Sequence, residues 1–225
     1  MKKKIIIACS KRWFTDNEKV KKYLIKNKKT IEIITKKKYL NLKNLNKIQP
    51  NIIFFPHWSY LVNEKIVNKF KCICFHSAPL PYGRGGSPIQ NLIIRNYKST
   101  PLYALQMSKK LDSGPIYLRQ NLSLKGNLKD ILNLMAIKIL KMIKIILKKK
   151  IHPKNQKGKI FIFKRLKEKN SEIKKEKNIN KIYDKIRMLD ADEYPKSFIK
   201  IGKFKIYFFN AIKRKNHLIC TVKIV

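Results

Sequence analysis

The sequence predicts an α/β fold with a mainly parallel sheet, followed by a short C-terminal α+β module. Short apolar runs recur in the first third of the chain, at residues 5–10, 31–35, 51–56 and 72–76. Polar stretches of about a dozen residues with helix-like spacing of apolar positions separate these runs, and this alternation is typical of βαβ units. No Gly-x-Gly-x-x-Gly follows the first run, so a dinucleotide site is unsupported.

The remaining pattern predicts the other elements and the division of the chain. In order, we expect helices at 16–28, 40–48 and 62–70, a helix at 87–96, strands at 101–108 and 115–124, a helix at 128–147, a strand at 160–163, a helix at 178–189 and strands within 198–225. Ser87 is the expected N-cap of its helix, with Pro88 at the first helical position. The three expected parts are a catalytic domain at 1–150, a charged linker at 151–177 and a short module at 178–225.

The formal net charge is +41, from 54 Lys and Arg against 13 Asp and Glu. Two interpretations stay open. A basic surface could bind nucleic acid or an anionic membrane. Alternatively, the excess of Lys, Ile and Asn reflects a compositional bias of the whole chain, and the spread of cations over both flanks favours this second interpretation. Attraction to polyanions would follow from the charge in either case.

The four cysteines, Cys9, Cys72, Cys74 and Cys220, have a spacing that fits no common zinc site. We therefore expect free thiols, a reducing cytoplasmic compartment and no metal. The apolar run near the N-terminus is shorter than that of a signal peptide. Lysines interrupt the long apolar stretch at 131–147, so we expect no membrane span.

A loop rich in glycine and proline follows the fourth apolar run, and together they read CICFHSAPLPYGRGGSP at 72–88. Alternate residues of a strand point the same way, so Cys74 and His76 share a face. His76 falls at the carboxyl end of the strand, where open α/β sheets bind ligands, and its imidazole can act as a base near neutral pH. Asp112 lies in a later Leu-Asp-Ser-Gly turn and could orient His76 if the sheet brings the two together. The plainer alternatives are a structural histidine, a buried strand thiol and an Asp that suits a tight turn.

Aromatic residues follow the third apolar run, in FPHWSY at 55–60. Trp58 and Tyr60 could flank a flat ring by stacking. The alternative is aromatic packing at the end of a strand. For His57 we expect a structural role.

The stretch HSAPLPYGRGGSPIQ, followed by LDSG, resembles the formyltransferases that use a 10-formyl-folate donor. That family includes enzymes acting on methionyl-tRNA, on glycinamide ribonucleotide and on sugar nucleotides. The match covers roughly residues 1–150 and rests on His76, Pro81, Arg84, Gly85, Asp112 and Gly114.

The resemblance implies a Rossmann-like formyltransferase fold, 10-formyltetrahydrofolate as co-substrate, no metal, and direct transfer of a formyl group to an amine. It also implies that His76 assists proton removal or stabilises the tetrahedral intermediate, with Asp112 supporting it. The expected contacts to the folate are Pro81, Arg84, Gly85, Leu111, Gly114 and Trp58.

One position departs from the family pattern. The family has Asn two residues before the histidine, where this chain has Cys74. A thiol is a weak hydrogen-bond donor, and losing one oxyanion donor costs on the order of a hundredfold in rate. Three explanations stay open: Gln106, Asn91 or a backbone N–H replaces the amide; Cys74 serves directly; or the protein does not catalyse the family reaction.

The C-terminal stretch at 182–212 resembles the segment that opens the C-terminal module of methionyl-tRNA formyltransferases and some sugar formyltransferases, at Arg187, Pro195 and Phe198. Few residues remain after 150 for a full tRNA-binding domain. We therefore expect a small-molecule acceptor, the amino group of a nucleotide-linked amino sugar, with Arg84, Arg95 and Arg119 as weak candidates for its diphosphate.

Two alternatives to this function stay open. The first is a methionyl-tRNA formyltransferase-like enzyme with tRNA as partner. The second is a catalytically weak nucleic-acid-binding protein on the same scaffold. The apolar C-terminal strands are also compatible with a homodimer.

Overall fold

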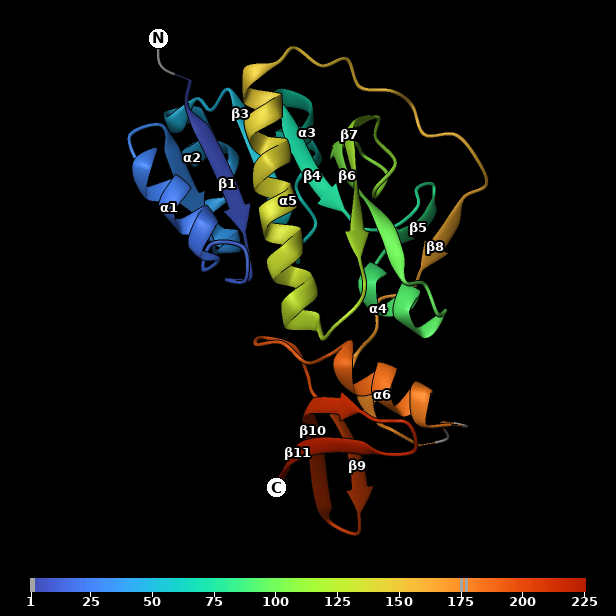
Figure 1. Cartoon of the computed structure of the whole chain (residues 1–225). Helices are drawn as coiled ribbons and strands as arrows, with labels where there is room; N and C mark the ends of the chain where they lie inside the picture. The colour runs from blue at the N-terminus through green and yellow to red at the C-terminus, as the bar shows by residue number, and fades with distance from the viewer. Residues whose placement is uncertain (1–2, 175, 177) are drawn as a thin grey trace.

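The computed structural model describes residues 3–174, 176 and 178–225 (Figure 1). Its main sheet has six strands in the order β2-β1-β3-β4-β6-β7. These strands are β1 (Ile5–Cys9), β2 (Ile31–Ile34), β3 (Ile52–His57), β4 (Cys72–His76), β6 (Ser99–Gln106) and β7 (Ile116–Ser123). The first four pair in parallel, whereas β6 and β7 are antiparallel. The predicted α/β fold with a mainly parallel sheet is therefore confirmed.

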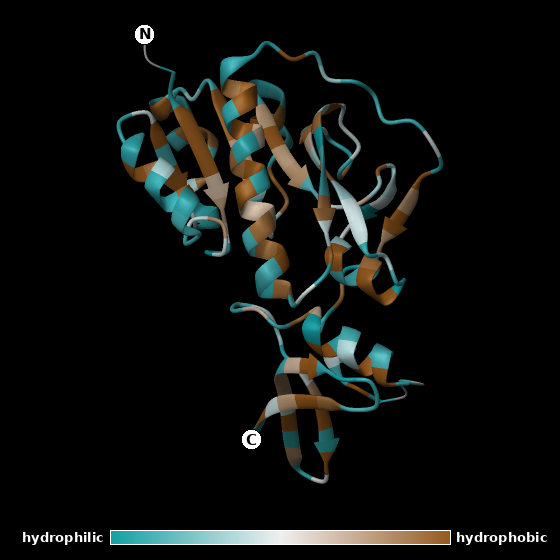
Figure 2. Cartoon of the chain, viewed as in Figure 1, coloured by the Kyte–Doolittle hydropathy of each residue, from teal (hydrophilic) through white to brown (hydrophobic). Residues whose placement is uncertain are grey.

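Both faces of the central strands β1 and β3 are buried, which is why these two strands read as continuous apolar runs (Figure 2). The helices are α1 (Glu18–Lys26), α2 (Leu42–Ile48), α3 (Glu64–Lys69), α4 (Pro88–Ile94) and α5 (Leu128–Lys148), with a short 3₁₀ turn at Lys37–Tyr39. Apolar residues of α1, α4 and α5 share one core cluster with one face of the sheet, and those of α2 and α3 share a second cluster with the other face.

Helix α5 begins where its sequence predicts. Asn127 caps it, because its Oδ1 accepts from the backbone N–H of Asp130 at 2.9 Å while Asp130 Oδ2 accepts from Asn127 N at 3.2 Å. None of the helices in the described ranges is both long enough and apolar enough to cross a membrane.

Helix α4 begins with Pro88, as expected, but the predicted capping role of Ser87 was wrong. Ser87 has φ 50° and its side chain makes no cap hydrogen bond. Its Oγ instead accepts from the backbone N–H of Leu166 at 3.1 Å. The hydroxyl thus holds a distant segment against the start of the helix.

The glycine-rich loop contains a short strand that the sequence did not predict. β5 (Tyr82–Gly85) pairs in parallel with β8 (Phe161–Phe163), forming a separate two-stranded sheet. The rings of Tyr82 and Phe161 stack with their centroids 4.9 Å apart. The chain after α5 therefore returns to the loop that follows His76 before it leaves for the C-terminal module (Figure 1).

The C-terminal module lies beyond the N-terminal end of α5 (Figure 1). After a 3₁₀ turn at Glu168–Ser171 it contains α6 (Ile179–Arg187) and an antiparallel sheet of order β11-β10-β9, with β9 at Ser197–Ile201, β10 at Phe204–Lys213 and β11 at Leu218–Ile224. The division expected at 150 and 177 stays a prediction. Segment 151–163 lies against the α/β part, through β8 and a bridge from Lys154 to Ile116.

The buried Arg187 joins the two parts. Its Nε donates to Asp184 Oδ1 at 2.7 Å, and its Nη1 donates to the carbonyl oxygens of Leu124 and Gly126, both at 2.7 Å. Those carbonyls belong to the connection between β7 and α5. Arg187 of α6 thus binds the turn that precedes α5.

Candidate active site

His76 and Asp112 meet at the carboxyl edge of the sheet, as the sequence predicts. His76 is the last residue of β4, and Asp112 lies in the turn between β6 and β7. His76 Nδ1 is 3.4 Å from Asp112 Oδ2, with 7% and 12% of the two side chains exposed. Because β6 runs antiparallel to β4, its last residue Gln106 lies opposite Ile73, near the start of β4, so the connection at 107–115 extends back along β4 to bring Asp112 to His76.

The backbone of the glycine-rich loop closes around this pair. His76 Nε2 lies 2.8 Å from the carbonyl oxygen of Gly83, and the N–H of Gly85 donates to Asp112 Oδ2 at 2.9 Å. Gly85 has φ 104°, and a Cβ there would lie 2.5 Å from the carbonyl oxygen of Phe163. The glycines are therefore needed for the backbone to fit between the pair and β8.

These contacts restrict where His76 can carry protons. A carbonyl oxygen only accepts hydrogen bonds, so Nε2 carries a hydrogen in the contact with Gly83. Nδ1 then faces a carboxylate, which can stabilise a proton held on that nitrogen. The arrangement can accept a proton and stabilise the resulting positive charge.

Cys74, which the sequence placed on the same face as His76, is a protonated thiol near neutral pH. Burial raises its pKa well above the ordinary value, and the negative charge of Asp112 raises it further. The side chain packs beside a buried cluster of Leu80, Tyr103 and Leu105. A thiolate nucleophile is therefore disfavoured at this position.

Neither of the two named side chains replaces the missing amide. The Nδ2 of Asn91 donates to the carbonyl oxygens of Gly86, Ser87 and Lys164. Gln106 lies opposite Ile73, whereas Cys74 lies opposite Leu105, so Gln106 points to the other face of the sheet. Of the replacements proposed for the amide, a backbone N–H remains.

Arg84 is bound within the protein by a residue that the sequence analysis missed. Its Nε and Nη2 donate to Gln156 Oε1 at 3.1 and 2.8 Å. Gln156 Nε2 in turn donates to the carbonyl oxygens of Asp112 and Gly114 at 2.8 and 2.9 Å. Nothing in IHPKNQKGK except a polar side chain among lysines distinguishes this glutamine.

The other expected folate contacts lie around this edge in different environments. A Cβ at Gly114 would lie only 1.8 Å from the carbonyl oxygen of Gln106, so the turn packs directly on β6. Leu111 is 59% exposed. The carbonyl of Pro81 accepts from Phe161 N at 3.3 Å. Their contacts to a ligand stay predictions.

Trp58 packs in the manner of the plainer alternative. Its ring makes edge contacts with Phe55 and Tyr60, with centroids 6.1 and 5.6 Å apart, and it lies against the second core cluster. Its predicted stacking on the folate stays a prediction.

A second histidine lies at the end of the neighbouring strand. His57 Nδ1 is 3.3 Å from Ser10 Oγ, across the ends of β3 and β1. Burial, together with the positive charges of Lys11 and Arg165, lowers the pKa of His57 to about 4. His57 is therefore neutral near pH 7, beside two cations that can face an anionic ligand.

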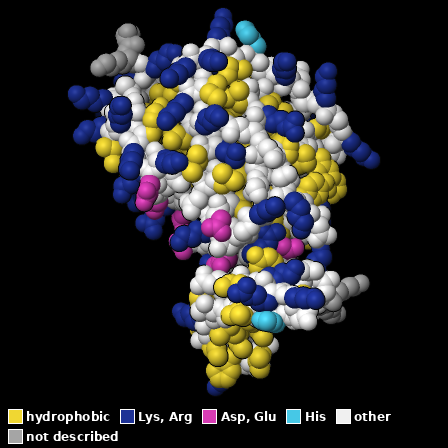
Figure 3. Space-filling view, viewed as in Figure 1, with side chains coloured by type: hydrophobic (Ala, Val, Ile, Leu, Met, Phe, Trp, Pro, Cys, Tyr) yellow, Lys and Arg dark blue, Asp and Glu magenta, His cyan; other side chains and the backbone are white. Residues whose placement is uncertain are grey.

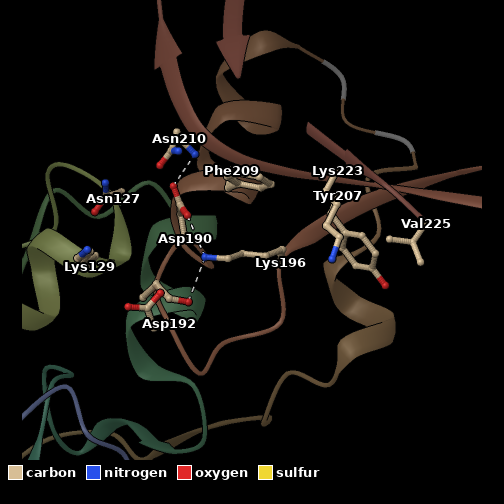
Figure 4. Close-up of a pocket in the computed structure, with 11 residues that line it drawn as sticks. Asn127, Lys129, Asp190, Asp192, Lys196, Tyr207, Phe209, Asn210, Lys223 and Val225 are labelled. Atoms are coloured by element: carbon tan, nitrogen blue, oxygen red, sulfur yellow. Dashed lines mark hydrogen bonds and ion pairs between the residues drawn. The ribbon is translucent and has the colours of Figure 1, made fainter. Parts of the chain in front are cut away.

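A cavity of about 530 Å³ lies away from His76, between the start of α5 and the C-terminal sheet (Figure 4). Tyr207 and Phe209 line it on one side, and Asp190 and Lys196 on another. Lys196 Nζ is 3.0 Å from Asp190 Oδ1. The cavity belongs to the junction between the two parts.

In the described part of the chain, no group of three or more His, Cys, Asp or Glu side chains is placed to hold a metal ion.

Comparison with known proteins places these features in one family. A family model for the C-terminal domain of methionyl-tRNA formyltransferase matches residues 168–225. A solved methionyl-tRNA formyltransferase from Clostridium thermocellum superposes with a TM-score of 0.94 and 38% identity over 99% of both chains. A 4-N formyltransferase from Francisella tularensis shares the fold at a TM-score of 0.63 and 20% identity, over 89% of this chain and 93% of that one.

The curated relatives are longer than this chain. The methionyl-tRNA formyltransferase of Clostridium beijerinckii is 26% identical over 184 residues, which are 78% of this chain and 60% of the relative. That of Campylobacter lari is 30% identical over 109 residues, or 47% and 36% of the two chains. The matched regions thus span about 60% and 36% of these relatives.

The expected amino-sugar acceptor was wrong. That expectation rested on the small number of residues after 150. The short C-terminal stretch nevertheless matches the model of a methionyl-tRNA formyltransferase domain, and the Clostridium thermocellum structure has the same extent as this chain. A short module therefore does not exclude tRNA as the acceptor, and the first alternative is the better supported one.

Proposed function

The chain belongs to the methionyl-tRNA formyltransferase family, and on that premise we propose that it transfers a formyl group from 10-formyltetrahydrofolate to the amino group of methionyl-tRNA. The observation that carries this proposal is the buried His76–Asp112 pair at the carboxyl edge of the sheet, enclosed by a glycine-rich loop. Because the matched regions cover only part of the curated relatives, activity and substrate are both proposals.

In this mechanism, the acceptor nitrogen bonds to the formyl carbon, and the bond from that carbon to the folate nitrogen breaks. The proton that the amine loses goes to Nδ1 of His76, because Nε2 already carries the hydrogen donated to Gly83, and it then passes to the released folate nitrogen. Asp112 stabilises the imidazolium at 3.4 Å, and the N–H of Gly85 keeps the carboxylate oriented. Cys74 stays a thiol and contributes packing beside the pair. The folate supplies the formyl group.

The residues around the edge fit a flat, partly apolar co-substrate. The segment after β3 and the turn that holds Asp112 are joined by an ion pair between Lys109 and Glu64, with 3.4 Å between Nζ and Oε1. Each of these two segments presents an exposed leucine: Leu61 is 85% and Leu111 is 59% exposed. We propose that a pterin ring covers these leucines, since burying apolar surface stabilises a bound ligand.

The charge of the chain suits a polyanionic acceptor. Lys and Arg side chains are scattered over both parts of the face in Figure 3. Lys11 and Arg165 lie near the strand end that carries His57. Positive charge of this kind attracts the phosphate backbone of RNA and makes binding depend on salt. A reducing cytoplasmic compartment, proposed from four free cysteines, is consistent with an acceptor used in translation.

The test is formyl transfer with the purified protein. We would supply 10-formyltetrahydrofolate with methionyl-tRNA, and in parallel with a panel of amino-sugar nucleotides and with uncharged tRNA as controls. Tetrahydrofolate release and acceptor mass would be followed. We expect a formyl mass gain on methionyl-tRNA alone. A gain on a sugar nucleotide, or none on any acceptor, would overturn the proposal.

A further inference from the structure

Gln156 lies between two segments of the candidate active site. It belongs to the connection between α5 and β8, outside the catalytic domain that the sequence suggested. It lies 72 positions after Arg84 and 44 after Asp112, the residues that it joins. Its side chain is partly buried.

The amide of Gln156 is used completely. The oxygen accepts two N–H groups of one guanidinium, and the nitrogen donates to two carbonyls of one turn, all between 2.8 and 3.1 Å. An amide has two acceptor sites and two donors, so every one is occupied. Such saturation fixes the side chain in one orientation, with its acceptor toward Arg84 and its donors toward the turn.

The turn that Gln156 holds is the one that carries the carboxylate. Asp112 has φ 50°, a backbone conformation that non-glycine residues rarely adopt. Its carboxylate contacts both His76 and Gly85, which lies one residue beyond Arg84. The bridge through Gln156 therefore sets the distance between the Asp112 turn and the Arg84 loop. The contact between His76 and Asp112 depends on that distance.

We propose that Gln156 is a positioning residue that holds the Asp112 turn against the Arg84 loop, in the geometry that His76 needs for proton transfer. This inference rests on the proposed formyl transfer. On this inference, the connection between α5 and β8 contributes a residue to the candidate active site.

Two substitutions distinguish the contact of Gln156 with Arg84 from its contact with the Asp112 turn. Gln156→Glu keeps an acceptor for Arg84, but it sets a carboxylate oxygen against two carbonyl oxygens, so the turn loses both of its donors. Gln156→Met removes both halves at similar volume. Asn155→Ala is the matched control, because this neighbouring side chain is exposed and makes no hydrogen bond or ion pair within the described residues.

The experiment measures steady-state transfer to methionyl-tRNA together with ¹H–¹⁵N spectra of histidine-labelled protein. The chain has four histidines, so their ring signals can be assigned by substitution. For Gln156→Glu we expect kcat to fall by roughly ten- to a hundredfold, because small misplacements of a catalytic group have effects of this size. We expect KM to change little, and the ring signals of His76 to shift while those of His152 and His217 stay in place. Asn155→Ala should match the wild type.

Normal kcat and unshifted His76 signals in Gln156→Glu would overturn the inference. A purely structural role would lower the unfolding temperature without changing kcat or these signals. If Gln156→Glu does not fold, Arg84→Met breaks the same bridge from the other side and is read in the same way. If the wild type transfers no formyl group, the proposed function fails, while the His76 spectra still decide whether Gln156 positions that ring.

Discussion

Two buried pairs of a basic and an acidic side chain, His76 with Asp112 and Arg187 with Asp184, lie in the described part of the chain and are built differently. In both pairs, the basic side chain is 7% exposed and the acidic one 12%. Arg187 and Asp184 lie 2.7 Å apart, and the guanidinium also binds two carbonyl oxygens. His76 and Asp112 lie 3.4 Å apart, and the same carboxylate oxygen is shared with the N–H of Gly85.

The difference indicates how each pair is used. A buried charge with short, saturated hydrogen bonds stabilises the structure around it, because removing it leaves its partners unpaired. A pair of equal burial with a long contact can still exchange a proton and change its geometry when substrates bind. Burial alone therefore does not separate a structural pair from a reactive one.

The largest expected effect comes from His76→Ala. We expect formyl transfer to fall by roughly a thousandfold or more, because the proton acceptor is removed. The unfolding temperature should fall modestly while the chain still folds, because the Gly83 carbonyl and the Asp112 carboxylate lose a buried partner. Single-turnover kinetics and thermal denaturation measure the two quantities. His152→Ala, at an exposed histidine, is the control. Near-normal turnover in His76→Ala would remove the imidazole from the mechanism and end the contrast between the two pairs.

Arg187→Met should have the opposite pattern. We expect about 3 kcal/mol of lost stability, since the buried carboxylate of Asp184 and two carbonyl groups lose their donor. Transfer per folded molecule should stay near that of the wild type. Urea denaturation measures the loss, and adding Asp184→Leu should recover part of it. A drop in kcat at full stability would show that the junction takes part in the chemistry.

His57 sharpens the contrast through pH. Its pKa is about 4 in the folded protein and 6.5 ordinarily, because of burial and of the nearby Lys11 and Arg165. The unfolded chain therefore binds more protons between these values, so stability is complete above pH 6.5 and declines as pH falls toward 4. We expect a loss of about 3 kcal/mol over this window. Urea denaturation at several pH values gives the free energy of unfolding as a function of pH. In His57→Gln this free energy should depend less on pH between 4 and 6.5, and an unchanged dependence would contradict the assignment.

Cys74→Asn carries the smallest expected effect. If the thiol only occupies the amide position of the family pattern, activity should stay or rise by up to roughly tenfold, because an amide is the better donor. Initial rates compared with Cys74→Ser distinguish donor strength from packing. A collapse of activity in the asparagine variant would mean that the thiol itself is required beside Asp112.

The central parallel strands were predictable because each is buried on both faces and so reads as a nearly uninterrupted apolar run, as at Ile5–Cys9 and Ile52–His57. Helix α5 was predictable from the helical period of its apolar residues. β5 was missed because glycine and proline normally indicate a loop, and its partner Phe161–Phe163 lies far along the chain. Such long-range pairing leaves no local pattern.

The residues of the candidate site also divide into those that local sequence motifs predict and those that depend on contacts between distant segments. His76 and Asp112 were identifiable because each sits in a motif with fixed spacing, and the connection between β6 and β7 folds back to bring them together. Gln156 was not, because its role depends on where α5 ends and how the chain returns to Arg84. The acceptor was misjudged from length alone, since a count of residues does not reveal which domain model a segment matches.

The pairing of β8 with β5 has a consequence for synthesis on the ribosome. Chains emerge from the N-terminus, and segments fold as they become available. His76, the glycine-rich loop and Asp112 all emerge before Gln156 and Phe161–Phe163, which complete their surroundings. A nascent chain released before residue 156 would therefore contain the reactive pair without the residues that hold the loop and the turn together.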